Sequence, residues 1–122
     1  MDLPIVNDAN YPDFLAAESA VVTFGMIACV ACEAFDPIFR AVAERYHETI
    51  MFGKAKMHVP GACREIKKQF SFDTFPTTHF YKNGTLVHTA TGRLDEDDLI
   101  HRIETHGLIP VSSRGLSKSS VC

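Results

Sequence analysis

Residues 20–32 read Ala-Val-Val-Thr-Phe-Gly-Met-Ile-Ala-Cys-Val-Ala-Cys, and this stretch decides the fold. The compact apolar run of β-forming residues at 20–24 is typical of a buried central strand. From Val30 onward the period changes, because apolar residues recur at helical spacing on one face. These residues are Phe35, Ile38, Phe39, Val42 and Tyr46. The stretch therefore predicts a strand that leads into a helix, with Cys29 and Cys32 at the junction.

On both sides of this junction the chain predicts further strands that alternate with helices. Strands are expected at residues 5–6, 50–57, 77–81 and 85–90, and the Asn83-Gly84 pair predicts a tight hairpin turn between the last two. Helices are expected after Asn10, after Pro60 and after Asp95. The order β-α-β-α-β-α-β-β-α indicates an α/β fold with a mixed sheet covered on both faces.

Length and composition narrow the class of protein. The 122 residues predict one folded domain, with 46% apolar and 22% charged residues as in globular proteins. A net charge of −3 without a basic run gives no support for a nucleic-acid partner. No apolar stretch approaches the roughly 18 residues of a membrane span. Asp2 stands where an export signal needs a positive charge, so we expect a cytoplasmic location.

The C-terminal end differs from the rest of the chain. Residues 111–122 are rich in serine and lack apolar periodicity, so we expect a folded domain over 1–110 and a mobile tail after it.

Cys29 and Cys32 carry the predicted chemistry. At a helix start, free backbone N–H groups and the helix dipole stabilise an anion, which lowers the pKa of a cysteine below its usual value of about 8.5. Spacing by three residues places Cys32 one turn deeper, where it can close a disulfide with Cys29. We therefore expect Cys29 to attack disulfides in partner proteins and Cys32 to resolve the mixed disulfide, with no cofactor besides this redox-active pair.

Other interpretations of the four cysteines remain open at this point. Cys29 and Cys32 could be buried structural thiols or half of a zinc site, although no second C-x-x-C is present. Cys63 falls on an apolar helix face and is expected in the core. We expect a monomer, with a dimer through Cys63 or Cys122 as the alternative.

Several motifs together show that residues 5–107 resemble the thioredoxin family. They are Val21-Val22-Thr23-Phe24, Cys29-Val30-Ala31-Cys32, Pro37, Phe75-Pro76-Thr77, Phe80-Tyr81-Lys82-Asn83-Gly84 and Gly92. The resemblance implies the thioredoxin fold, with a central mixed sheet of five (or four) strands flanked by four helices. It also implies a thiol–disulfide oxidoreductase acting on protein disulfides and recycled by a disulfide reductase.

The resemblance assigns further residues to the site. In the family the proline before the fourth strand is cis and lies against the active-site disulfide, a role carried here to Pro76. Its neighbouring backbone pairs with the substrate chain, so the substrate-binding groove is expected beside it. The residues expected to contact substrate are Ala28, Val30, Phe75, Pro76, Thr77 and Gly92.

The chain also departs from the family pattern. Ala28 replaces the usual Trp, Val30-Ala31 replaces Gly-Pro, and Thr23 stands where a buried Asp normally assists the second cysteine. Thr cannot act as a base near neutral pH. The Lys that accompanies that Asp is assigned to Lys56, now without its partner. These departures favour a slower or more specialised exchanger, and leave open a binding or assembly module with weak or no redox catalysis.

Overall fold

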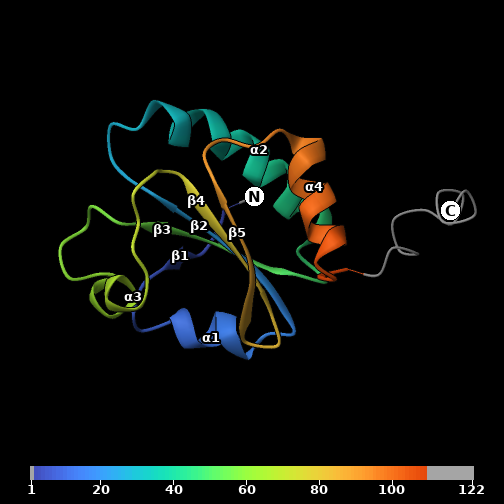
Figure 1. Cartoon of the computed structure of the whole chain (residues 1–122), viewed down its shortest axis with the longest axis horizontal. Helices are drawn as coiled ribbons and strands as arrows, with labels where there is room; N and C mark the ends of the chain where they lie inside the picture. The colour runs from blue at the N-terminus through green and yellow to red at the C-terminus, as the bar shows by residue number, and fades with distance from the viewer. Residues whose placement is uncertain (1, 110–122) are drawn as a thin grey trace, which may run out of the picture.

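The computed structural model describes residues 2–109, in which helices and strands follow the predicted order (Figure 1). The strands are β1 (Ile5–Val6), β2 (Ser19–Gly25), β3 (Met51–Lys56), β4 (Thr77–Lys82) and β5 (Thr85–Thr91). The helices are α1 (Tyr11–Ala16), α2 (Val30–Tyr46), α3 (Arg64–Gln69) and α4 (Glu96–Thr105). The predicted tail at 111–122, with Cys122, lies outside the described residues.

The strands form one mixed sheet in the order β1-β3-β2-β4-β5. β1, β3 and β2 run parallel, while β4 pairs antiparallel with both β2 and β5. β2 lies in the middle, and its residues are buried except at Gly25, as expected for a strand with neighbours on both edges and helices on both faces. The predicted five-stranded mixed sheet is confirmed.

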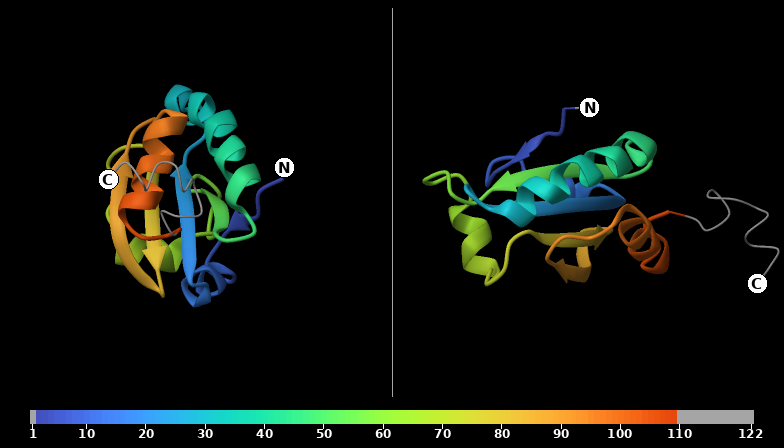
Figure 2. Two further views of the ribbon diagram at one scale, coloured as in Figure 1. Left: turned by 90° about the vertical axis from the view of Figure 1, so that its right-hand side faces the viewer. Right: turned by 90° about the horizontal axis from the view of Figure 1, so that it is seen from above.

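Helices cover the two faces in pairs (Figure 2). α2 and α4 pack on one face through a core that includes Phe35, Phe39, Leu99 and Ile103. α1 and α3 pack on the other face, where Phe14 and Ile66 are fully buried. The fold thereby fixes β2 and α2, the two elements that meet at the cysteine pair.

α1 begins after Asn10 as expected but without the expected cap bond, and α3 begins later than expected. Asn10 occupies the N-cap position of α1, but its side chain makes no cap bond and instead hydrogen-bonds within the preceding turn, to Ile5 and Asn7. Pro60 lies in a turn, and α3 begins later, at Arg64. At Asn10, side-chain hydrogen bonds within the turn take the place of the cap bond.

Candidate active site

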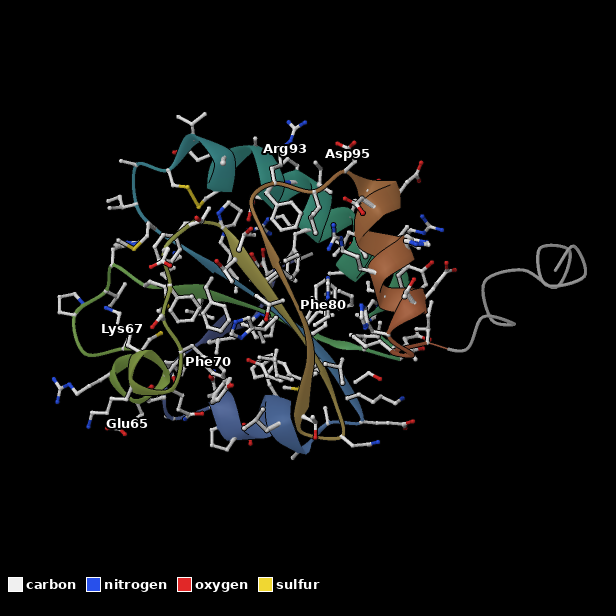
Figure 3. The ribbon with its side chains drawn as sticks, viewed as in Figure 1. Glu65, Lys67, Phe70, Phe80, Arg93 and Asp95 are labelled. Atoms are coloured by element: carbon white, nitrogen blue, oxygen red, sulfur yellow. A yellow bond between two sulfur atoms is a disulfide. The ribbon has the colours of Figure 1, made fainter. Side chains whose placement is uncertain are left out.

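Cys29 and Cys32 form a disulfide in the segment that joins β2 to α2. Figure 3 draws it as a yellow bond between the two sulfur atoms. Their Cα atoms lie 5.2 Å apart. Cys29 is the N-cap residue of α2, and its Sγ accepts a hydrogen bond from the Cys32 N–H at 3.1 Å. Both cysteines are partly exposed, so the interpretation as two buried structural thiols is wrong. The geometry gives the Cys29 sulfur the helix N–H that stabilises a thiolate.

Pro76 lies opposite the disulfide. The peptide bond between Phe75 and Pro76 is cis, which confirms the geometry implied by the family resemblance. The Phe75 carbonyl oxygen is 3.7 Å from Cys29 Sγ, and Pro76 shares a small cavity with Cys32. The Gly92 N–H donates to the Pro76 carbonyl at 2.7 Å. The Pro76 segment, far from the cysteines in sequence, therefore lies beside them, and the Gly92 backbone holds it by a hydrogen bond.

The surface around Cys29 is apolar. Val30 is 82% exposed and Ile27 is 69% exposed, and Ala28 between them in sequence is exposed with a left-handed φ of 56° that turns the chain into α2. A groove of about 490 Å³ lies beside this loop, lined by Met26 and the aromatic segment that contains Phe70, labelled in Figure 3. Met26 and Ile27 were missed from sequence, although apolar residues in a predicted loop are a signal for a contact surface.

Thr77 does not belong to this exposed surface. It is 4% exposed, and its hydroxyl donates to the Thr74 carbonyl. Its strand, β4, lies between β2 and β5, so backbone available to an added strand is limited to the segment before Pro76. Of the residues expected to flank the groove, Phe75 faces Cys29 and Thr77 does not.

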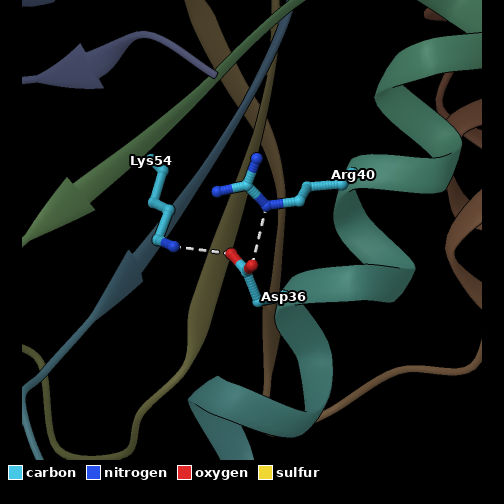
Figure 4. Close-up of polar contacts among 3 residues, drawn as sticks. All are labelled: Asp36, Arg40 and Lys54. Carbon is cyan, nitrogen blue, oxygen red and sulfur yellow. Dashed lines mark hydrogen bonds and ion pairs between the residues drawn. The ribbon is translucent and has the colours of Figure 1, made fainter. Parts of the chain in front are cut away.

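The lysine beside Thr23 is Lys54, and the assignment to Lys56 is wrong. Thr23 pairs with Lys54 across β2 and β3, whereas Lys56 pairs with Gly25 and is exposed. The two lysines lie on the same face of β3, since side chains alternate with period two, and only the register separates them. Lys54 also has a partner: its Nζ donates to Asp36 at 2.5 Å (Figure 4).

Asp36 supplies a carboxylate that the sequence interpretation did not include. It lies on α2 four residues after Cys32, and it accepts bonds from Lys54 and, at 2.7 Å, from Arg40 Nε. Burial favours its neutral form, but the hydrogen bonds and charges of Lys54 and Arg40 outweigh burial and lower the pKa of Asp36. Spacing of four residues on a helix was the available signal, because it places Cys32 and Asp36 on one face.

Cys63 is a core residue. It is 2% exposed, and its thiol donates a hydrogen bond to the Val6 carbonyl oxygen over 3.8 Å. Burial raises the pKa of this thiol. This agrees with the expected core position and leaves no sulfur surface for the alternative of a dimer through Cys63.

Two further classes of feature are not found in the described part of the chain. No three or more His, Cys, Asp or Glu side chains within residues 2–109 are grouped to hold a metal ion. No helix in the same range combines the length and apolar character that crossing a membrane requires.

Known proteins resemble this chain in overall sequence and in fold. The thioredoxin family model matches residues 2–105. The thioredoxin of Chlamydia trachomatis is 29% identical over 103 residues, covering 84% of this chain and 96% of that protein, and that of Chlamydia muridarum is also 29% identical over the same length. Thioredoxin f2 of Chlamydomonas reinhardtii superposes with a TM-score of 0.76 at 23% identity, covering 89% of this chain and all of that one. A thioredoxin of Malassezia sympodialis gives 0.73 at 19% identity, covering 86% and 90%.

Proposed function

This chain belongs to the thioredoxin family and is a dithiol–disulfide oxidoreductase, and we propose that Cys29 attacks protein disulfides while Cys32 resolves the mixed disulfide. The observation that carries the proposal is the asymmetry of the pair. Cys29 Sγ receives the N–H of Cys32 at the exposed start of α2, and Cys32 lies one turn further along. The sulfur at the helix start is the one whose anion is stabilised.

The reaction proceeds by two exchanges. The Cys29 thiolate attacks one sulfur of the substrate disulfide, a bond forms between Cys29 and that sulfur, and the other substrate sulfur leaves as a thiolate. The Cys32 sulfur then attacks Cys29 Sγ, which closes the Cys29–Cys32 disulfide and releases the second substrate thiol. The substrate gains two electrons and the protein loses two.

Substrate contacts are proposed on the apolar surface around Cys29. Ala28 and Val30 lie exposed beside the attacking sulfur, and Phe75 directs its carbonyl at it. Behind this surface, the Gly92 N–H donates a hydrogen bond to the Pro76 carbonyl oxygen. These apolar side chains can pack against an extended segment of a substrate protein and so bring its disulfide close to Cys29.

The test is reduction of insulin disulfides in excess dithiothreitol. We expect the wild-type protein to accelerate the reaction and Cys29→Ser to give only the rate of dithiothreitol alone. Equal rates for the two proteins would overturn the assignment of Cys29.

The cellular setting stays a prediction. We propose a monomer in the cytoplasm that a disulfide reductase returns to the dithiol form. Replacement of the usual Trp by Ala28 alters the surface that such a reductase would contact. Incubation with a thioredoxin reductase and NADPH, followed by counting free thiols, tests whether an ordinary reductase serves this chain.

A further inference from the structure

A small cavity lies behind the disulfide on the side of Cys32. It has a volume of about 20 Å³ and is lined by Thr23, Cys32, Asp36 and Lys54 among others. Gly25 leaves the sulfur open on this side, because a β-carbon there would lie 3.4 Å from Cys32 Sγ. A cavity of this size with several polar groups has room for one water molecule.

A larger cavity shares lining residues with the small one. Its volume is about 330 Å³, and Cys32, Asp36 and Lys54 line it as well. The other titratable groups that line it are Glu33, Lys56 and His58. Asp36 therefore lines both the small cavity beside Cys32 and the larger one.

Among the described residues that line the small cavity, Asp36 is the one carboxylate. The hydrogen bonds and charges of Lys54 and Arg40 lower its pKa, so it can hold a proton only in transit. The Thr23 hydroxyl cannot act as a base, and its oxygen already accepts from Thr78 Oγ1 at 3.3 Å. Lys54 Nζ already donates a hydrogen bond to Asp36. Arg40 holds the second carboxylate oxygen of Asp36, so the carboxylate is fixed at both oxygens (Figure 4).

We propose that Asp36 accepts the proton that Cys32 loses when it resolves the mixed disulfide. The inference rests on the proposed order of the two cysteines. In this step the Cys29–Cys32 bond forms, the bond from Cys29 to the substrate breaks, and the electron pair leaves on the substrate sulfur. The proton passes from Cys32 through water to Asp36 and then to the departing thiolate, so atoms and charge balance.

Titratable and charged side chains near Cys32 come from several elements. α2 contributes Glu33, Asp36 and Arg40, β3 contributes Lys54 and Lys56, and the segment after β3 contributes His58. Removing a carboxylate that only repels a thiolate would make Cys32 ionise more easily and speed resolution. Removing a proton acceptor would slow resolution. The sign of the effect of Asp36→Asn therefore separates the two roles.

The experiment is a stopped-flow reaction of the reduced full-length protein with dithionitrobenzoate. Attack by Cys29 releases the first thionitrobenzoate, and resolution by Cys32 releases the second. We expect Asp36→Asn to slow the second release by on the order of a hundredfold at pH 7, the low end for loss of a general base. The loss should shrink as pH rises, because hydroxide then removes the proton. Glu33→Gln, a carboxylate change that reaches only the larger cavity, is the matched control and should leave the second release unchanged.

Three results define the outcome. An unchanged or faster second release in Asp36→Asn overturns the proposal, as does equal slowing in Glu33→Gln. The double variant Asp36→Asn/Lys54→Met, which leaves no unpaired ammonium, should remain slow if folding is intact.

The signal of a Cys29→Ser/Cys32→Ser protein is subtracted to remove the contribution of the other cysteines. Failure of the proposed function would differ, since the first release would then not depend on Cys29.

Discussion

Cys29 and Cys63 hold the same local position, because each is the N-cap residue of a helix. At Cys29 the side chain accepts the Cys32 N–H, and α2 continues for 17 residues. At Cys63 the side chain makes no cap bond, and α3 has 6 residues. The first N–H groups of α3 are taken instead by the Asp8 carboxylate, at 2.9 Å to Glu65 N and 3.1 Å to Ile66 N.

The difference shows that a helix start does not by itself make a reactive thiol. The sulfur must also receive the free N–H groups and reach the surface. Cys63 does neither, since Asp8 binds those groups and the thiol is buried against Val6. Burial first, and then the charge of Asp8, raises the pKa of Cys63.

The largest expected effect is in alkylation of the reduced, folded protein. At pH 7 we expect Cys29 to react with iodoacetamide about a thousandfold faster than Cys63, because the first is a stabilised, accessible thiolate and the second a buried thiol. Peptide mass spectrometry after timed quenching measures both rates. In urea the two rates should converge, and similar rates in the folded protein would contradict the contrast.

Serine substitutions separate the cysteines by function. Cys32→Ser should accumulate a mixed disulfide between Cys29 and insulin and lower turnover by about a hundredfold or more, since the resolving sulfur is gone. Cys63→Ser is the matched control and should turn over at the wild-type rate. Non-reducing electrophoresis detects the trapped species. A trapped species in Cys63→Ser would place that thiol in the reaction.

Alkaline pH should destabilise the fold through Cys63. Its pKa is raised in the folded state, so above the unfolded value of about 8.5 the folded chain holds a proton that the unfolded chain has lost. Stability is complete below that pH and falls above it by at most about 1.4 kcal/mol per pH unit. Urea unfolding of the reduced protein between pH 8 and pH 10 measures the slope, and Cys63→Ala should lack this part of it. Equal slopes would contradict the raised pKa.

Removing Asp8 should give the smallest effect. Asp8→Ala leaves the two N–H groups at the start of α3 without their acceptor, at a cost of about 1 kcal/mol in the free energy of unfolding. Asp8→Asn keeps an acceptor oxygen and should lose less. Urea unfolding at pH 7 compares the two variants. Equal stability of Asp8→Ala and wild type would show that water replaces the carboxylate without loss.

Much of the fold and the redox pair could be predicted from local pattern. The apolar run at 20–24, the Asn83-Gly84 turn and the cysteine spacing each act over a few residues, and the structure has the elements they predict. The cis bond before Pro76 followed from resemblance to a family rather than from local pattern.

The charged groups behind Cys32 could not be predicted in the same way. Lys54 and Lys56 share a strand and a face, so composition and period do not distinguish them. The spacing of four residues places Asp36 on the same helix face as Cys32. It does not determine whether the Asp36 carboxylate contacts a lysine or is solvated by water.

Short-range periodicity was sufficient for the strand, the helix and the two sulfurs at their junction, because backbone geometry ties neighbouring residues together over a turn or a pleat. Which lysine pairs with Thr23, and which carboxylate joins them beside Cys32, was settled only when β3 took its register against β2 and α2 packed over both. Those contacts join residues distant in sequence, and a shift of the strand by one residue would have replaced them all.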